Sequence, residues 1–404
     1  YSQFNGDYPY NHITAVDGDL SAGGGMEYPN ITVISKMGSK HLLEMVIMHE
    51  VGHNWFYGML GSNERDHAWM DEGLNSHNEL RYMRNKYPEY NMFLDILPNK
   101  LKKIFDLEDY SNKQIAGEII YFMNAWTGKD QPIELHSADY TSTNYFGIVY
   151  SKTAIVFDYL MAYLGEDMYD KCMRAYFKKW HYKHPQPKDL RAVFEEVSGE
   201  NLAWFFEDVI GTIKQLDYAI VDVKKETKDL LVILENKGGI AGPVIISGVK
   251  DGQSMTPLWI EGFEGEKTIR YLNGDYDHVR IDYNGDMPET NRNNNIMRVK
   301  GMFKTLEPIR PQIIGSMYHP EKTQVFYTPM IDYNVYNRYS YGFSFYNRFI
   351  PKEGFSYKIT PMYSNGSENI SGSLNLTYSK FNRESNIFNF KILDQDIEES
   401  FRHR

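Results

Sequence analysis

At about 150 residues per domain, a chain of 404 residues has room for two or three domains, which excludes a mini-protein. Its 43 Lys and Arg residues against 54 Asp and Glu residues give a net charge of −11, which repels phosphate backbones, so we expect no nucleic acid among its partners. The single cysteine, Cys172, excludes an internal disulfide and a cysteine-cluster metal site. Any metal must therefore be held by histidines and carboxylates.

The first region, residues 1–216, predicts a mainly helical domain with a short β opening. Residues 16–34 contain three consecutive glycines and indicate strand, turn and strand. Apolar residues then recur at helical spacing, which predicts a first helix over residues 40–60 and a second helix from an N-cap at Asp66 to residue 87. Further helices are predicted over residues 155–164, 168–180 and 188–210.

Two β regions follow the helical region. Near residue 217 the period changes from helical to two-fold, and four to seven short strands predict a small β-sandwich over residues 217–298. We do not expect the polar run at residues 288–295 to pack. Residues 299–404 predict longer antiparallel strands that are rich in aromatic residues, with strands over 341–349, 355–363, 374–381 and 387–392. The fold class predicted for the whole chain is multidomain α+β.

The aromatic strands leave two interpretations open. Strands of about 9–11 residues with aromatic ends are typical of an outer-membrane-type barrel, of which residues 323–392 would be the start. A soluble antiparallel sheet is the alternative. The first interpretation predicts an exported, periplasmic or outer-membrane-associated protein of a bacterium, attached through the C-terminal β segment. The sequence has no run of 18 apolar residues that would predict a transmembrane helix.

Metal-ligand spacing occurs in the first predicted helix, in the run His49-Glu50-Val51-Gly52-His53. A helix places residues four apart on one face, so both imidazoles can reach a single zinc ion. Glu50 is next to a ligand but rotated away from it, which suits a general base for a metal-activated water. The pentapeptide alone could also occur by chance on a surface helix.

The second predicted helix offers a third ligand, Glu72, with a solvated helix charge beside Asp71 as the alternative. Eighteen residues separate His53 from Glu72, enough for one helix to end and another to present a carboxylate to the metal. Three protein ligands leave one position open, which a catalytic zinc needs. Glu79 lies seven residues after Glu72 on the same helix face, so we expect it to orient a ligand imidazole, with a surface charge as the alternative.

These motifs resemble a known family. The run from His49 to Phe56, followed by Trp69-Met70-Asp71-Glu72-Gly73, resembles the zinc signature of the aminopeptidase N and leukotriene hydrolase family, a group of gluzincins. The resemblance implies a thermolysin-like catalytic domain, a following β-sandwich and one Zn²⁺ per chain. It also implies that the family's large N-terminal β-domain is missing upstream of this chain.

The segment Gly24-Gly25-Met26-Glu27-Tyr28 resembles the family's substrate-binding strand, except that Tyr28 replaces an asparagine. The resemblance implies that Gly24, Gly25 and Met26 line the substrate groove and that Glu27 holds the substrate's free amino terminus. A carboxylate can make a charge-assisted hydrogen bond to a terminal ammonium, which an internal amide does not offer.

Two tyrosines complete the predicted site. By the resemblance, Tyr150 donates a hydrogen bond to the oxyanion that forms during hydrolysis, and Tyr145 contributes to substrate binding. The sequence therefore predicts a zinc aminopeptidase that acts on peptides with a free N-terminus. An endopeptidase with the same ligands, and a non-catalytic surface or scaffold protein, remain as alternatives.

Overall fold

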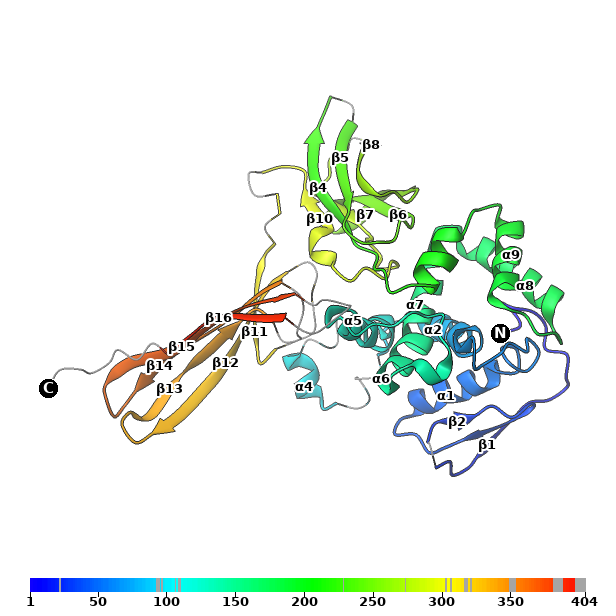
Figure 1. The fold of residues 1–404 in the computed structure, drawn as a ribbon, viewed down its shortest axis with the longest axis horizontal. Helices are drawn as coiled ribbons and strands as arrows, with labels where there is room; N and C mark the ends of the chain where they lie inside the picture. The colour runs from blue at the N-terminus through cyan, green and yellow to red at the C-terminus, as the bar shows by residue number, and fades with distance from the viewer. Residues whose placement is uncertain are drawn as a thin grey trace. The chain divides into compact units, whose positions relative to one another are not determined.

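The computed structural model describes residues 1–21, 23–91, 95, 97–105, 107, 110–227, 229–272, 274–301, 304–305, 307–315, 319, 322–348, 354–380 and 388–396. The chain divides into two compact units (Figure 1). The first comprises Tyr1–Ile96, Tyr110–Phe122 and Asp130–Thr305, and the second comprises Leu97–Asp109, Met123–Lys129 and Leu306–Arg404. The predicted boundaries at residues 216 and 298 stay predictions.

The first unit opens with a three-stranded sheet in the order β1-β3-β2. Strands β1 (Thr14–Asp17) and β3 (Ile31–Ile34) are parallel, and β2 (Gly25–Met26) runs antiparallel to β3. Because β2 has a hydrogen-bonded neighbour on one side, its other backbone edge is an edge of the sheet.

Helix α1 (Lys40–Gly52) begins at Ser39, whose hydroxyl accepts a hydrogen bond from the Leu42 amide at 3.1 Å. The predicted end at residue 60 was wrong, because the chain turns after His53. Several amides of this segment donate to carbonyls three to five residues before them, but the Tyr57 amide donates forward to the Leu60 carbonyl, and Tyr57 has φ 87°. Phe56 and Leu60 are buried within these turns, so their helix-like spacing was not evidence of a helix.

Helix α2 (Glu72–Lys86) follows the short helix η1 (Ala68–Met70). The predicted N-cap at Asp66 was wrong. Asp71 caps the helix instead, and its carboxylate accepts a hydrogen bond from the Glu72 amide at 2.8 Å. Glu72 is therefore the first residue of α2, at the end that carries unpaired backbone donors.

The remaining helical elements are α4 (Asn99–Ile104), η3 (Lys113–Glu118), α5 (Ile119–Trp126), η4 (Ser137–Asp139), α6 (Ser142–Asn144), η5 (Tyr145–Lys152), α7 (Thr153–Leu164), α8 (Glu166–Trp180), α9 (Pro187–Ser198), η6 (Trp204–Ile210) and η7 (Arg292–Asn294). The predicted helix over 188–210 is interrupted, because Gly199 has φ 75° and ends α9 in the left-handed conformation. Elements η3, η5 and η6 are π-helical. Among the described residues, no helix combines the length and the apolarity that a membrane span requires.

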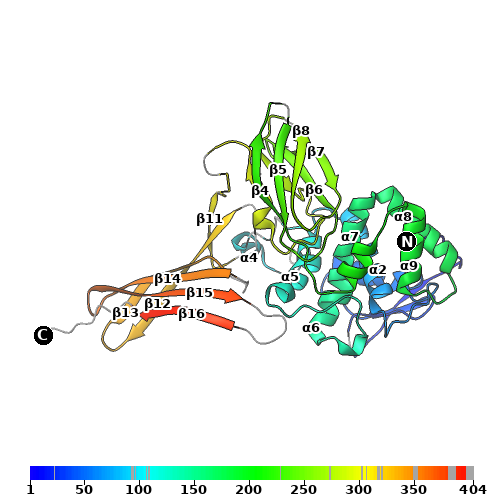
Figure 2. The same cartoon turned by 45° about the horizontal axis from the view of Figure 1, so that its top comes forward.

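The first unit continues with two sheets, seen in Figure 2. One has the order β4-β5-β8 and the other β10-β9-β6-β7. Their strands are β4 (Tyr218–Lys225), β5 (Asp229–Asn236), β6 (Val244–Lys250), β7 (Gln253–Ile260), β8 (Gly265–Leu272), β9 (His278–Ile281) and β10 (Ile296–Arg298). Apolar side chains of both sheets are buried, and the Tyr271 hydroxyl on β8 accepts a hydrogen bond from the Gly248 amide on β6 at 2.7 Å.

The polar run at residues 288–295 does pack, contrary to our expectation. Glu289 and Asn295 are buried, and Arg292 makes two hydrogen bonds to the Glu118 carboxylate, at 2.8 and 2.9 Å. Charged side chains can be buried when each meets a partner of opposite charge and fitting geometry. The sequence pattern could not reveal this partner, which lies 174 residues away.

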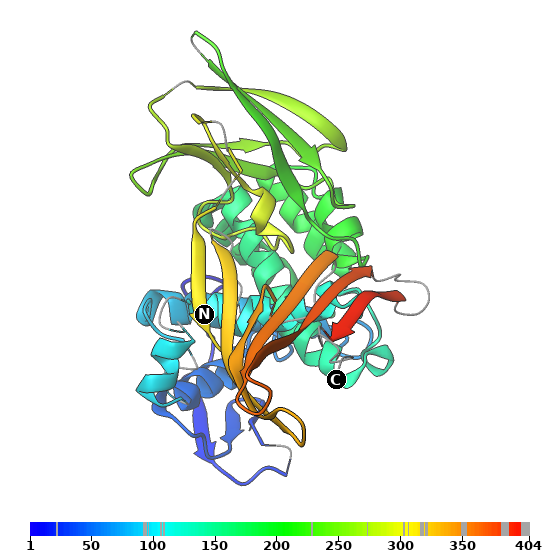
Figure 3. The same ribbon diagram turned by 90° about the vertical axis from the view of Figure 1, so that its left-hand side faces the viewer.

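The second unit contains a six-stranded sheet in the order β11-β12-β13-β14-β15-β16 (Figure 3). Its strands are β11 (Ile309–Ile313), β12 (Thr323–Asn334), β13 (Arg338–Tyr346), β14 (Gly354–Ser364), β15 (Asn369–Lys380) and β16 (Phe388–Asp396). Neighbours are antiparallel except β11 and β12, which are parallel, so the predicted all-antiparallel pattern was wrong at this edge. Phe349, Phe381 and Ile387, which the sequence placed at strand ends, lie outside the described residues.

Candidate active site

Helices α1 and α2 bring three ligand atoms together. His49 Nε2 lies 3.1 Å from Glu72 Oε2 and 3.2 Å from His53 Nε2, and His53 Nε2 lies 3.2 Å from Glu72 Oε2. The two histidines are one turn apart on α1, and Glu72 begins α2. Within the described part of the chain, these three residues form the group of potential metal ligands whose donor atoms converge.

The outer ring nitrogens of both histidines have hydrogen-bond partners. His49 Nδ1 lies 3.1 Å from Glu79 Oε2, and His53 Nδ1 lies 3.2 Å from the Phe56 carbonyl oxygen. A proton on each Nδ1 satisfies these acceptors, which leaves the Nε2 lone pairs free to bind a metal. The structure thus places Glu79 where the sequence predicted an orienting carboxylate.

The donor set fits zinc. Two imidazole nitrogens and one carboxylate oxygen are ligands that zinc takes, and their mutual separations of 3.1–3.2 Å leave room for an ion at about 2.0–2.2 Å from each. Burial acts to raise the pKa of Glu72, but hydrogen bonds to His49 and His53 outweigh it and hold that pKa below its ordinary value. Glu72 is therefore an anion, as a metal ligand must be.

Glu50 is buried beside this group, and its Oε2 has no hydrogen-bond partner among the described residues. Burial raises the pKa of its carboxyl to about 7, partly offset by the neighbouring histidines. Gly25 makes room for it, because a Cβ at that position would lie 2.3–2.4 Å from the Glu50 side chain. The structure thereby brings the predicted base against the predicted substrate-binding strand.

Strand β2 carries the other predicted substrate-binding residues. Gly24 has φ 70° and leads into the strand, and Met26 pairs with Val33 of β3. Glu27 directly follows β2, is half-buried, and is close enough for its charge to act on both Glu50 and His53. No hydrogen bond or ion pair engages the Glu27 carboxylate within the described ranges. Tyr28, the departure from the family pattern, is 54% exposed.

Tyr150 and Tyr145 lie on the π-helical segment η5. The Tyr150 ring is 5.9 Å from the His49 ring and 5.9 Å from the Tyr145 ring. Burial, followed by the charge of Glu72, holds the pKa of the Tyr150 hydroxyl above its ordinary range, so it remains a hydrogen-bond donor at neutral pH. Burial, and then Glu72, also raises the pKa of Tyr145, to about 12.

Close packing explains how η5 reaches the ligands. A Cβ on Gly73 would lie 2.3 Å from the Thr153 side chain and 2.7 Å from the Val149 carbonyl oxygen. The glycine after Glu72 therefore lets α2 approach η5 directly, which places Tyr150 beside the ligand group. Insertion of a π-helical turn shifts the register of the side chains, and such turns are frequent at functional sites.

Sequence reasoning missed two residues that support the site. Asn75 donates a hydrogen bond to the His49 carbonyl oxygen at 2.7 Å and so ties α2 to α1. Glu134 accepts a hydrogen bond from Trp69 Nε1 at 2.6 Å and contacts His67 Nδ1 at 2.5 Å. Asn75 could have been found as a polar residue near Glu72 on the same helix. Glu134 lies more than 60 residues from its partners, and no pattern marks it.

Comparison of the sequence with known proteins identifies the family to which the chain belongs. A model described as the peptidase family M1 domain matches residues 1–209, just over half of the chain. The protein is 26% identical over 242 residues to aminopeptidase M1-C of Oryza sativa subsp. japonica, covering 56% of this chain and 25% of that relative. It is 24% identical over 204 residues to aminopeptidase N of Lactococcus lactis subsp. lactis, covering 50% of this chain and 22% of that relative.

A solved structure shares the fold. The crystal structure of Legionella pneumophila aminopeptidase A in complex with aspartic acid matches with a TM-score of 0.51 and 14% sequence identity, over 71% of this chain and 32% of that chain. The present chain spans about a quarter of the length of the curated relatives it matches. The resemblance to the aminopeptidase N family drawn from the sequence motifs is confirmed, and the chain belongs to peptidase family M1.

Proposed function

We propose that this chain is a zinc-dependent aminopeptidase, which hydrolyses the first peptide bond of substrates that have a free N-terminus. The observation that supports it best is the convergence of His49 Nε2, His53 Nε2 and Glu72 Oε2 next to a buried carboxyl, Glu50, with an unpartnered oxygen. Other buried side-chain atoms lack a partner too, but among the described residues Glu50 Oε2 is the carboxylate oxygen that does, and leaving a charged group unpaired costs more stability than leaving a neutral one.

His49, His53 and Glu72 would hold a zinc ion, which would supply Lewis-acid polarisation of a water and of the scissile carbonyl group. Glu50 takes the proton from the attacking water and returns it to the departing amine. Its pKa of about 7 matches both steps, since a base that must also act as an acid works best near the ambient pH.

Tyr150 donates its hydroxyl proton in a hydrogen bond to the oxygen that gains negative charge as the carbonyl carbon becomes tetrahedral. The raised pKa of this hydroxyl keeps the proton in place. Because the ring already lies beside His49, the donor is in position before the charge develops.

Strand β2 and Glu27 select the substrate. The free backbone edge of β2 can pair with an extended peptide, as in strand addition to a sheet. Glu27 follows this edge and can accept a charge-assisted hydrogen bond from the terminal ammonium of the bound peptide. That contact places the first peptide bond, and no later one, near Glu50.

The proposal is tested with the purified 404-residue chain by zinc analysis and by hydrolysis of a tripeptide and its N-acetylated twin. We expect one zinc per chain, release of the first amino acid from the free peptide, and a much lower rate on the acetylated twin. Glu27→Gln should slow hydrolysis of the free peptide and leave the rate on the acetylated twin unchanged. Glu44→Gln, on the same helix as Glu50, is the matched control and should leave both rates unchanged.

Two outcomes contradict the proposal in different ways. Comparable rates on the free and acetylated peptides, unaffected by Glu27→Gln, would indicate an endopeptidase that uses the same ligands. A chain that holds no zinc and hydrolyses neither peptide would indicate a scaffold without catalytic function.

A further inference from the structure

The four strands β12–β15 have two faces of opposite character. Register and alternation place one set of side chains on a single face. This aromatic face consists of Val325, Tyr327, Pro329, Ile331 and Tyr333 on β12, Tyr339, Tyr341, Phe343 and Phe345 on β13, Phe355, Tyr357, Ile359, Pro361 and Tyr363 on β14, and Ile370, Gly372, Leu374, Leu376 and Tyr378 on β15. None of these residues carries a charge.

The opposite face, which we call the hydroxyl face, bears Thr328, Ser340, Ser344, Ser356, Thr360, Ser364, Ser371, Ser373, Thr377 and Ser379. Ser340 and Ser364 are hydrogen-bonded at 2.7 Å, and Ser344 and Thr360 at 2.9 Å. The charged residues Asp332, Arg338 and Lys358 alternate onto this face as well. These three charged residues therefore lie on the hydroxyl face, which also carries the apolar residues Phe326, Met330 and Met362, whereas both faces bear hydroxyl groups.

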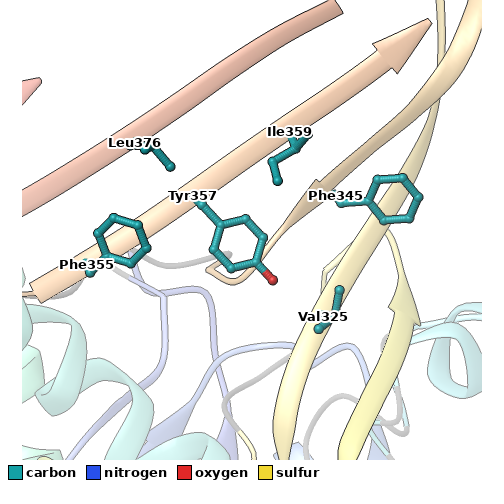
Figure 4. Close-up of a pocket in the computed structure, with 6 residues that line it drawn as sticks. All are labelled: Val325, Phe345, Phe355, Tyr357, Ile359 and Leu376. Atoms are coloured by element: carbon teal, nitrogen blue, oxygen red, sulfur yellow. The ribbon is translucent and has the colours of Figure 1, made fainter. Parts of the chain in front are cut away.

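The aromatic face is exposed to solvent and much of the hydroxyl face is buried, which is the opposite of what water favours. On the aromatic face Ile331 is 69% exposed and Ile370 is 76% exposed, whereas Ser344 and Ser364 on the hydroxyl face are at most 1% exposed. A sheet of a globular domain normally buries its apolar face and exposes its polar face. The aromatic face also has an open apolar depression of about 480 Å³, lined by Val325, Phe345, Phe355, Tyr357, Ile359 and Leu376 (Figure 4).

Tyrosines bound the apolar stretch at both ends on β12 and β14, and at one end on β13 and β15. On β12 the order along this face is Tyr327, Pro329, Ile331, Tyr333, and on β14 it is Tyr357, Ile359, Pro361, Tyr363. Six residues at about 3.3 Å each separate the two tyrosines of a strand by about 20 Å. Sheets that cross bilayers carry an outward apolar band about 25 Å tall between two rows of aromatic residues, with polar residues on the other face.

From these features we propose that the aromatic face of β12–β15 contacts the hydrocarbon interior of a lipid bilayer. Hydrocarbon is the complement of a face without charges, since no ionised group has to lose its water there. The tyrosines at each end place their hydroxyls at the polar headgroups, where amphipathic rings are favoured. A protein partner would instead call for polar and charged groups around the rim of the patch, where this face has tyrosines together with apolar residues such as Phe355 and Ile370.

The first test is flotation of the full 404-residue chain with neutral dioleoylphosphatidylcholine vesicles at high salt. These conditions remove electrostatic attraction, and the net charge of −11 offers none to a neutral surface. We expect the chain to float with the vesicles. A chain that stays at the bottom of the gradient in the presence of vesicles overturns the proposal.

Two neighbouring residues of β15 give a matched pair of charge variants. Leu374→Asp adds a charge to the aromatic face, and Asn375→Asp adds the same charge to the hydroxyl face, opposite Lys358. We expect Leu374→Asp to reduce vesicle binding about tenfold or more, and Asn375→Asp to bind as the unmodified chain does. Equal binding of the two variants, with circular dichroism showing both folded, overturns the proposal.

A fluorescent label provides a second test, which does not require Leu374→Asp to fold. Cys172 is buried, so a nitrobenzoxadiazole label reacts with a cysteine introduced by Leu374→Cys or Asn375→Cys. We expect vesicles to shift the emission of the label at position 374 to the blue and not that at 375. A blue-shifted emission of the label at position 374 without vesicles would overturn the proposal, because protein would then already cover the aromatic face. If that shift depends on protein concentration, a second copy of the chain covers the face. If it does not, another part of the same chain covers it.

Discussion

Glu50 and Glu289 are both buried carboxyls of the first unit, and burial raises the pKa of each, to about 7 and about 8. Their surroundings differ. Glu289 Oε1 accepts a hydrogen bond from the Tyr218 amide at 2.8 Å, and its Oε2 accepts one from Asn295. Glu50 Oε2 has no partner among the described residues.

The same contrast holds for the clusters around the two carboxyls. Near Glu289, both oxygens of Glu118 accept hydrogen bonds from Arg292, and those of Asp282 accept them from the amides of Asp286 and Met287. Near Glu50, the ligand nitrogens of the histidines converge. In the described ranges, the Glu27 carboxylate has no hydrogen bond or ion pair. Burial and a raised pKa are thus common to both clusters. Arg292 Nε and Asn295 Oδ1 also lack a partner among the described residues, so the difference between the clusters lies in their carboxylates. The oxygens of Glu118, Asp282 and Glu289 all accept hydrogen bonds, whereas Glu50 Oε2 is buried without a partner.

The largest effect is expected for Glu50→Gln. If Glu50 moves the proton in both steps, the variant should lose about 10²–10⁴-fold in kcat, since proton transfer by a positioned group contributes that much. Zinc content should not change, because the three ligands remain. The melting temperature should not fall, because an amide is easier to bury than an unpaired carboxyl. Turnover of a free tripeptide, zinc analysis and thermal unfolding measure the three quantities.

Glu289→Gln is the control for this prediction, because it makes the same chemical change in the other buried cluster. It should leave turnover unchanged. Near-native turnover of Glu50→Gln, or an equal loss in Glu289→Gln, would remove the distinction between the two clusters.

Arg292→Met tests the structural side of the comparison. Removing the guanidinium leaves the Glu118 carboxylate buried without its two hydrogen bonds, which should cost about 3–5 kcal/mol of unfolding free energy. Urea unfolding measures the loss. The double variant Arg292→Met with Glu118→Leu should recover most of it, because the Glu118 charge is then removed as well, although Asp282 still loses its ion pair with Arg292. If Arg292→Met is as stable as the unmodified chain, the pair of Arg292 and Glu118 contributes nothing to the free energy of unfolding.

Glu289 also predicts a pH dependence of stability. Its pKa is about 8 in the folded chain against 4.5 ordinarily, because burial and then Asp282 disfavour the anion. The folded state keeps this proton where the unfolded state releases it, so the contribution is full below pH 4.5 and is lost as pH rises toward about 8. Glu289→Gln should raise stability at pH 8 on the order of 2–3 kcal/mol relative to pH 5. An identical pH profile for the variant and the unmodified chain in urea unfolding would contradict this.

The sequence predicted those parts of the site that depend on local geometry. His49 and His53 are one turn apart in any helix, and Glu79 follows Glu72 at a spacing that keeps both on one face. Glu72 was predicted from its 18-residue separation from His53 and supported by the family resemblance. Tyr150 came from the resemblance alone, because family motifs carry information about contacts that spacing does not. The coarse fold class, α+β with several sheets, also followed from the change of period near residue 217.

Contacts between distant segments were not predictable in the same way. We expected residues 288–295 not to pack because the sequence shows that they are polar. It does not show that Arg292 among them pairs with Glu118. The apolar spacing after His53 predicted more helix, although Phe56 and Leu60 are buried equally well by turns. In both cases a tertiary contact decided the structure, and tertiary contacts override local preference.

The smallest effect is expected for substitutions of Glu134, which shares a feature with each kind of cluster. Its carboxylate is fully used, by Trp69 Nε1 and His67 Nδ1, yet both partners lie in the segment that leads into Glu72. Glu134→Ala should therefore loosen the position of Glu72 and weaken zinc binding about tenfold, as loss of an indirect support does. Glu134→Gln, which keeps an acceptor for Trp69, should bind nearly as well. Chelator competition measures the zinc affinity of both variants. An unchanged zinc affinity in Glu134→Ala would show that Glu134 supports the fold and not the metal site.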